Sequence, residues 1–213
     1  MHPKSRGLAD RLYATTRSLH AQAERSGVVR DILRGRATRQ GYSTLLRNLL
    51  PAYEEMEHGL DRHRDTPGVR MIVQPAVFRT RALESDLKAL CGEGWGSSLP
   101  LLPAGERYQQ RVVAAAHGTG ARLIAHAYTR YLGDLNGGQF LRRLLAQSLA
   151  LGPDMLSFYD FPAIEDPEEF KLQYRTALDR AGSELGVVDD VLDEAMVAFA
   201  LNIELSNAVQ AAL

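Results

Sequence analysis

This 213-residue chain has a single cysteine, no excess of either charge and no long apolar run. The one cysteine, Cys91, can form neither an internal disulfide nor a thiolate metal cage, which indicates a reducing compartment. With 25 basic and 26 acidic side chains the net charge is −1, whereas nucleic-acid binding needs a basic excess to neutralise phosphates. No window approaches the roughly 18 consecutive apolar residues of a membrane span, and residues 1–7 lack the apolar core of a secretory signal. We therefore expect a soluble, cytoplasmic protein without a membrane anchor and without a nucleic-acid partner.

Sustained alternation of apolar and polar residues is also missing, whereas apolar residues recur at helical spacing through most of the chain. This pattern predicts an all-α fold with roughly two-thirds helix and no strands. We expect one domain over residues 1–213, with residues 1–7 flexible. Thr38 should cap a long helix that Pro51 bends or interrupts, and residues 92–96 should form a glycine-rich connection. The predicted helices cover residues 8–25, 28–33, 38–64, 80–90, 103–116, 121–149, 168–181 and 188–212.

Three glycines, Gly133, Gly137 and Gly138, fall within six residues of the predicted 121–149 helix. Each costs about 1 kcal/mol relative to alanine inside a helix, so together they cost on the order of 3 kcal/mol. Gly133 and Gly137 lie one turn apart on one face, and Gly138 is expected to widen the bare patch. Close crossing of another helix explains glycines alone equally well. Asp134 adds a carboxylate at the edge of the patch, which favours a flat ligand such as a porphyrin and a reacting oxygen species.

A porphyrin iron needs an axial ligand, and His20 is the strongest candidate of the six histidines. Glu24 follows it by four residues on the same predicted helix, so a carboxylate can orient the ring and make the imidazole a better donor. Such a pair alone is more often a surface contact. His126 is expected on the glycine side of its helix rather than opposite it. Lys171 and Arg175, one turn apart, form a cationic pair that can meet the two propionates of haem, although this signal is weak.

At this point the sequence resembles the haem oxygenase family, in order and over nearly the whole chain. Residues 126–139 are similar to the glycine signature of that family, with Asn136 where serine is usual. Residues 18–24 (SLHAQAE), 170–175 (FKLQYR) and 199–202 (FALN) are similar to its proximal-ligand, propionate-contacting and final-helix segments. Tyr53 follows His20 by the same number of residues as a distal-pocket tyrosine of the family does, without a gap. Tyr13 also departs from the pattern, because many relatives carry a propionate-binding lysine at that position.

The resemblance implies that haem is clamped between a proximal and a distal helix. His20 would be the axial ligand of the iron and Glu24 its partner. Asp134 would organise a water network. The other residues implied are Gly133, Gly137 and Gly138 as the distal floor, Arg130 and Tyr53 as partners of Asp134, Lys171, Arg175 and Tyr128 at the propionates, and Tyr13, Phe199 and Asn202 as further haem contacts.

The implied reaction uses haem as both cofactor and substrate. Dioxygen and electrons from an external donor (a ferredoxin, a reductase or ascorbate) would open the ring to biliverdin, carbon monoxide and ferrous iron, and the α-isomer is expected. No flavin or nicotinamide motif is present, so the donor would be a separate molecule. Arg142 and Arg143 are candidates for its docking face, although a merely solvated pair explains them at least as well.

Two other functions match parts of the sequence. Glu55 and His58 form a Glu-x-x-His sequence of the kind found in di-iron bundles, but such sites need a second copy, which we do not find. The run around them, with Glu57 and His63, is expected to form a solvated face. A non-catalytic haem carrier or sensor on the same scaffold also stays open, although Asp134 and the glycines favour an enzyme.

Overall fold

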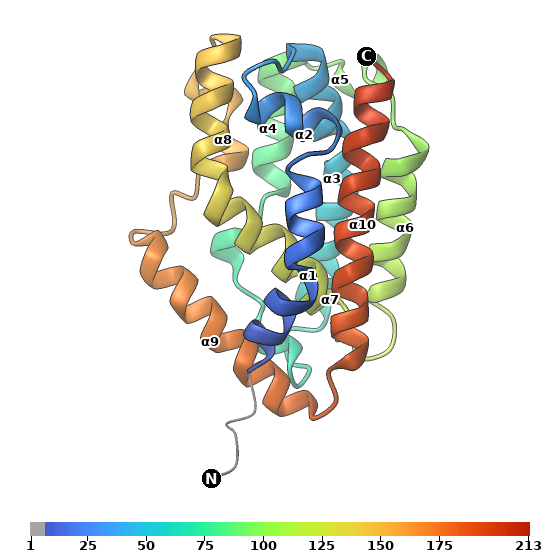
Figure 1. Cartoon of the computed structure of the whole chain (residues 1–213), viewed down its shortest axis with the longest axis vertical. Coiled ribbons are helices and arrows are strands. Elements are labelled where there is room, and N and C mark those ends of the chain that lie inside the picture. Colours follow the sequence, from blue (N-terminus) through green and yellow to red (C-terminus); the bar gives the residue numbers. More distant parts are fainter. Residues whose placement is uncertain (1–6) are drawn as a thin grey trace.

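Helices build all the regular structure of residues 7–213, which this computed structural model describes (Figure 1). Helix accounts for 76% of the described residues and no strand occurs among them, so the predicted all-α class is confirmed. Residues 1–6 of the segment expected to be flexible lie outside that range, whereas the carbonyl of Gly7 already accepts a hydrogen bond from the Arg11 amide (3.1 Å). The α-helices are α1 (Leu8–Ala23), α2 (Gly27–Leu33), α3 (Arg39–Arg62), α4 (Thr80–Cys91), α5 (Trp95–Ser98), α6 (Pro103–Ala115), α7 (Leu123–Ala127), α8 (Gly133–Leu149), α9 (Pro167–Leu185) and α10 (Asp189–Ala211).

The long helices α3, α6 and α10 run side by side along the length of the molecule (Figure 1). Helix α3 packs against α4 and α6, and α1 packs along α10. Helix α9 departs toward one end, where it contacts α1. Large side chains fill the centre, among them Tyr42, Tyr53, Tyr108, Tyr131 and Phe158. This bundle sets α1 and α8 on two sides of a common space.

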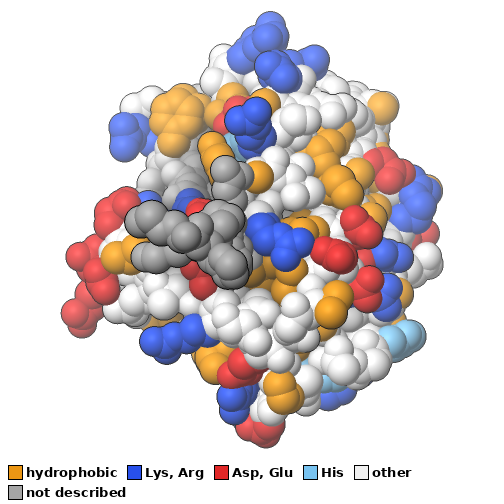
Figure 2. All heavy atoms as spheres, turned by 60° about the horizontal axis from the view of Figure 1, so that its bottom comes forward, with side chains coloured by type: hydrophobic (Ala, Val, Ile, Leu, Met, Phe, Trp, Pro, Cys, Tyr) orange, Lys and Arg blue, Asp and Glu red, His pale blue; other side chains and the backbone are white. Residues whose placement is uncertain are grey.

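Acidic and basic side chains are interspersed over the outer face that Figure 2 shows, with apolar side chains between them. This mixture fits the near-zero net charge of the chain. A local charge cluster, rather than an overall excess, must therefore recognise any anionic group.

Local sequence signals account for several helix ends. The hydroxyl of Thr38 accepts from the Gly41 amide (3.0 Å) and caps α3 as predicted, and Pro103 opens α6 at the start of the predicted 103–116 helix. Pro51 does not interrupt α3, which continues from Arg39 to Arg62. Pro51 is buried in that helix, so packing stabilises the turn that lacks a hydrogen bond. The glycine-rich connection contains the short helix α5, because Trp95 packs against the core and the Arg47 guanidinium lies 5.5 Å from its ring.

The predicted 121–149 helix is divided in three. Helix α7 runs into a π-helical turn, η3 (Tyr128–Leu132), and then into α8. A π turn holds more residues than an α turn and changes the face that later residues present. Such turns are frequent at functional sites. Residues before and after η3 therefore cannot be placed on one stripe by α-helical counting.

Candidate active site

A cleft of about 350 Å³ opens between α1, α2, α3, α8 and α10. A second hollow of about 230 Å³ adjoins it. Aliphatic side chains such as Leu45 and Leu49 line the larger one, whereas Arg17 and Arg175 line the smaller one. Both hollows are lined by His20, Thr129, Gly133, Asn136 and Phe199. The cleft as a whole suits a ligand with an apolar body and an anionic edge.

His20 projects from α1 into both hollows. Its Nδ1 lies 3.6 Å from Oε1 of Glu24, at ion-pair distance rather than in a hydrogen bond, and 56% of each side chain is exposed. The ring of Phe199 on α10 lies 6.0 Å from the His20 ring, centroid to centroid. Because Nδ1 is turned toward Glu24, Nε2 is the nitrogen left to bind a metal ion.

The three signature glycines do not share one role. A β-carbon built on Gly133 or Gly137 would meet no atom within 4 Å, and both residues line the cleft. A β-carbon on Gly138 would come 2.9 Å from Cδ1 of Tyr159. The expectation that Gly138 widens the same bare patch is therefore wrong, because Gly138 packs against Tyr159 and lines neither hollow. Nothing in the protein itself requires glycine at positions 133 and 137, which leaves the space above them for a ligand.

Asp134, Arg130 and Tyr53 form a buried polar group at the wall of the cleft. The Tyr53 hydroxyl donates to Oδ2 of Asp134. Arg130 donates through Nε to the Tyr53 oxygen (2.7 Å) and through Nη2 to Oδ1 of Asp134 (3.2 Å). The three residues that the family resemblance grouped together are thus in direct contact. Two of them come from the η3–α8 segment and one comes from α3.

Burial controls the ionisation of this group. Burial raises the pKa of Asp134 above its ordinary value, although Arg130, Tyr53 and Arg79 favour the carboxylate. Burial also raises the pKa of the Tyr53 hydroxyl, which keeps its proton. Burial opposes the charge of Arg130, but its partners Tyr53 and Asp134 outweigh this and raise its pKa. Asp134 is therefore closer to proton exchange near neutral pH than an exposed aspartate would be.

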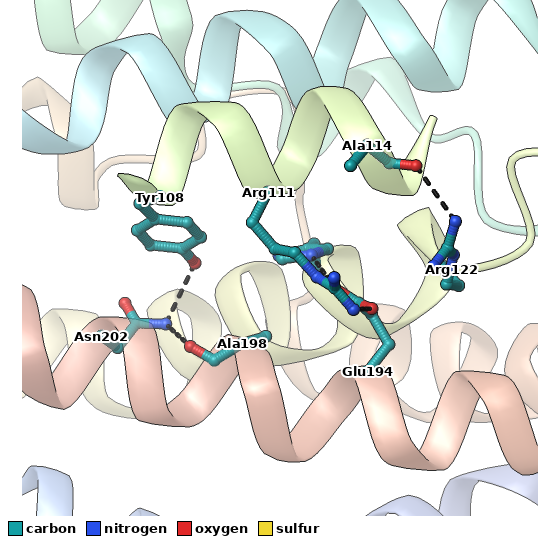
Figure 3. Close-up of polar contacts among 8 residues, drawn as sticks. Tyr108, Arg111, Ala114, Arg122, Glu194, Ala198 and Asn202 are labelled. Atoms are coloured by element: carbon teal, nitrogen blue, oxygen red, sulfur yellow. Dashed lines mark hydrogen bonds and ion pairs between the residues drawn. The ribbon is translucent and has the colours of Figure 1, made fainter. Parts of the chain in front are cut away.

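Asn202 on α10 also contacts Arg130. Its Nδ2 donates to the Tyr108 hydroxyl (3.0 Å) and to the Ala198 carbonyl (2.7 Å; Figure 3). These two acceptors orient the amide so that its Oδ1 accepts from Nη1 of Arg130. Asn202 lines the cleft, and through its contact with Arg130 it supports the group that holds Asp134.

The smaller hollow has two guanidinium groups near it. Arg175, which the sequence indicated, lines it together with Tyr13 and Tyr128, whose hydroxyl lies 3.4 Å from the Thr16 hydroxyl. Arg17, which the sequence analysis missed, lines it as well. The signal was available, because Arg17 stands one turn before His20 on the same helix.

Lys171 lines neither hollow. Its ammonium pairs with Glu168, one turn earlier on α9. The side chain must leave that partner to reach an anion in the smaller hollow.

Sequence reasoning also missed side chains whose position depends on distant contacts. Thr129 and Asn136 line both hollows, and Tyr159 lines the larger one. Asn136 appeared only as a departure from the family pattern. Nothing in the local sequence around Tyr159 connects it with Gln139 of α8, 20 residues earlier.

His126 is not on the glycine side of the helix, which corrects the expectation from α-helical counting. It is fully buried, and its Nε2 lies 2.9 Å from Oε1 of Glu194 on α10. Arg111 on α6 donates through Nε to the same carboxylate (2.8 Å; Figure 3). Burial opposes the charge of Glu194, but hydrogen bonds from His126 and Arg111 outweigh it and lower its pKa to about 2. The physical reason is the π turn between His126 and Gly133, which places the two residues on different faces of the helix.

The run around the Glu-x-x-His sequence is not a solvated face throughout. His58 is exposed, but Glu57 is buried and its carboxylate accepts from the backbone amides of Arg79 and Thr80 at the start of α4. His63 is partly buried, with Nε2 2.9 Å from the Ala116 carbonyl. Within residues 7–213, no group of three or more His, Cys, Asp or Glu side chains is arranged to hold a metal ion.

Arg142 and Arg143 line a third hollow, of about 310 Å³, on α8. Nη1 of Arg142 lies 3.6 Å from Oδ1 of Asp160, a partly exposed ion pair. Among the helices of residues 7–213, none combines the length and the hydropathy needed to cross a bilayer. The cytoplasmic location stays a prediction.

Comparison with known proteins gives one consistent result. The family model "Heme oxygenase" matches residues 6–208. Heme oxygenase 1 of Nostoc is 36% identical over 202 residues, which cover 94% of this chain and 85% of the relative, and heme oxygenase 1 of Rattus norvegicus is 34% identical, covering 98% and 73%. The crystal structure of heme oxygenase-1 from Synechocystis in complex with heme superposes with a TM-score of 0.92 at 33% identity, covering 97% and 94% of the two chains. Heme oxygenase from Leptospira interrogans gives 0.88 at 34% identity, covering 95% and 99%.

These matches confirm the family, the all-helical fold and the enzyme class that the sequence predicted. They extend over the segments that carry His20, Asp134 and the glycines. The chain belongs to the haem oxygenase family.

Proposed function

We propose that this chain opens haem to biliverdin, with release of carbon monoxide and ferrous iron, and that dioxygen and electrons from an external donor drive the reaction. One observation carries the assignment of residues. His20 of α1 and the open glycines 133 and 137 of α8 line the same cleft, and the buried carboxylate of Asp134 lies beside them. A histidine, a flat space and an acid are what oxidation of a bound porphyrin needs.

The residues present fit haem. The space above Gly133 and Gly137 would admit a flat macrocycle, and His20, oriented by Glu24, would supply an imidazole nitrogen to its iron. The aliphatic wall with Leu45 and Leu49 suits the apolar edge of the porphyrin. Bound haem supplies a redox-active iron for dioxygen and is itself the porphyrin consumed.

Asp134 is the residue that we assign to proton delivery. Its carboxyl group is buried, its pKa is raised by that burial, and it lines the cleft. Arg130 and Tyr53 hold its two oxygens, so that the carboxyl keeps one orientation while it exchanges a proton with water in the cleft. General acid–base catalysis requires such a group at short range.

Arg175 and Arg17 are assigned to the propionates, with Tyr128, Tyr13 and a reoriented Lys171. A guanidinium binds a carboxylate bidentately, so these groups orient the macrocycle in its plane. That orientation decides which meso carbon is oxidised, and we expect the α-isomer of biliverdin.

The electron donor is assigned to a separate protein or to a small reductant. Arg142 and Arg143 are the proposed contacts for a donor protein with an acidic surface. The ion pair of Arg142 with Asp160 is only partly buried and can open when such a partner docks.

The proposal is tested with purified protein, one equivalent of haem, and ascorbate or a ferredoxin system. Ring opening is followed as loss of the Soret band and appearance of biliverdin by chromatography. His20→Ala should lose the histidine-ligated spectrum and recover part of it on addition of imidazole. His117→Ala is the matched control, because His117 is exposed and lines neither hollow.

An unchanged spectrum in His20→Ala would contradict the assigned ligand. Stable haem binding without any bilin product, with a reductant that reduces the iron, would instead identify a carrier.

A further inference from the structure

The loop at residues 157–160, which contains the short 3-10 helix η5 (Ser157–Tyr159), is held by side chains from other parts of the fold. The carboxylate of Asp86 on α4 accepts from the backbone amides of Ser157 (2.8 Å) and Phe158 (2.9 Å). Arg79, which is 7% exposed, donates through Nη1 to the Asp160 carbonyl. Gln139 on α8 donates through Nε2 to the Tyr159 carbonyl (2.8 Å). Each residue of the loop is thus fixed by a side chain from another part of the fold.

Tyr159 is the side chain that this loop presents to the cleft. Its ring packs against α8 at the point where Gly138 lacks a β-carbon, and the Phe158 ring lies 4.8 Å away, centroid to centroid. Tyr159 is 4% exposed and lines the larger hollow together with Asp134 and Gly137. The glycine at 138 is therefore explained by the placement of this ring.

Within residues 7–213, the hydroxyl of Tyr159 makes no hydrogen bond with another residue, and it is not among the polar atoms sealed completely from the cleft and the solvent. Burial raises the pKa of Tyr159, and the nearby Asp134 carboxylate raises it further, so the hydroxyl keeps its proton at neutral pH. A buried phenol normally finds a partner for its O–H group. Here a water molecule in the cleft is the partner that remains.

We propose that Tyr159 is a further positioning residue of the reaction, whose hydroxyl donates a hydrogen bond to a water molecule that Asp134 also binds. The water then has two fixed partners on the wall of the cleft, and its remaining proton points toward the bound substrate. Tyr159 acts through this water and exchanges no proton itself. The inference rests on the proposed function of the cleft.

Tyr159→Phe removes only the hydroxyl and keeps the ring against Gly138. Tyr174→Phe is the matched control, because Tyr174 is buried, its hydroxyl has no partner among the described residues, and it lines neither hollow. Loss of one neutral hydrogen bond should lower the ring-opening rate of Tyr159→Phe about fivefold, with haem affinity within about twofold of wild type. The pH midpoint of the Soret shift of the ferric haem complex should rise by roughly 0.5 unit. Tyr174→Phe should change neither the rate nor the midpoint.

A second measurement tests the shared water. If Tyr159 acts with Asp134, adding Tyr159→Phe to Asp134→Asn should cause little further loss, because interacting residues are not additive. Rates and midpoints of Tyr159→Phe equal to those of Tyr174→Phe would overturn the proposal, and so would full additivity with Asp134→Asn. Wild type that forms no bilin would contradict the proposed function instead, and the Soret midpoint would still decide the role of Tyr159.

Discussion

Two neighbouring glycines of α8 should respond in opposite ways to the same substitution. Gly137→Ala adds a methyl group that meets no atom within 4 Å, so the haem-free protein should gain the helix propensity of alanine, about 1 kcal/mol. Gly138→Ala has the same propensity gain, but its methyl group would lie 2.9 Å from the Tyr159 ring. Overpacking of this kind costs about 1–3 kcal/mol. Gly137→Ala should therefore be more stable than Gly138→Ala by about 1–3 kcal/mol.

The two alanine variants are compared first by thermal unfolding of the haem-free proteins. At this chain length a change of 1 kcal/mol moves Tm by about 2–4 °C, so Gly137→Ala should unfold a few degrees above wild type and Gly138→Ala near or below it. In a haem titration the order should be reversed, with Gly137→Ala binding haem more weakly than Gly138→Ala. The methyl group of Gly137→Ala occupies ligand space, and a similar overpacking cost weakens haem binding about tenfold or more.

A haem-free Gly137→Ala protein as unstable as Gly138→Ala would refute the assignment of residue 137 to an open face. Wild-type haem affinity and turnover in Gly137→Ala would also refute it, since glycine would then serve helix packing.

Three further predictions concern the charged side chains of the cleft and of the buried Glu194 cluster. Asp134→Ala should keep haem binding near normal while ring opening falls by roughly 100-fold, and biliverdin formation at the wild-type rate would contradict its role in proton delivery. Replacing Lys171 and Arg175 together should weaken haem binding or alter the biliverdin isomers seen by chromatography; a wild-type β or δ isomer would contradict the expected orientation. Glu194→Gln should lower the free energy of unfolding by roughly 3 kcal/mol at neutral pH, because the pKa of Glu194 is lowered from 4.5 to about 2. The difference in unfolding free energy between wild type and Glu194→Gln should be present above about pH 4.5 and shrink as the pH falls toward 2. Denaturant titrations in which this difference stays constant with pH would contradict the assignment.

The ligand-facing residues could be predicted where the chemistry is local. His20 and Glu24 are one turn apart on one helix, and Asp134 lies within the glycine run, so helical spacing was enough to identify them as candidates. Tyr53 came only through the resemblance, because its 81-residue separation from Asp134 carries no local signal.

Counting along an ideal helix failed where the helix is not ideal. The π turn at Tyr128–Leu132 moved His126 into the core, where Glu194 and Arg111 hold it. Charge patterning failed at Glu57, since a carboxylate in a charged run is buried when it caps the start of another helix.

The sequence by itself determined the all-helical class, most helix positions and the presence of a histidine, an acid and a glycine-rich turn, because these depend on spacing within one helix. Only the tertiary structure decided which glycine faces a ligand and which faces Tyr159, and that Arg17 joins Arg175 at the smaller hollow. The physical reason is the same in each case. Burial and partnership are properties of contacts between distant segments, and they appear only when the bundle brings those segments together.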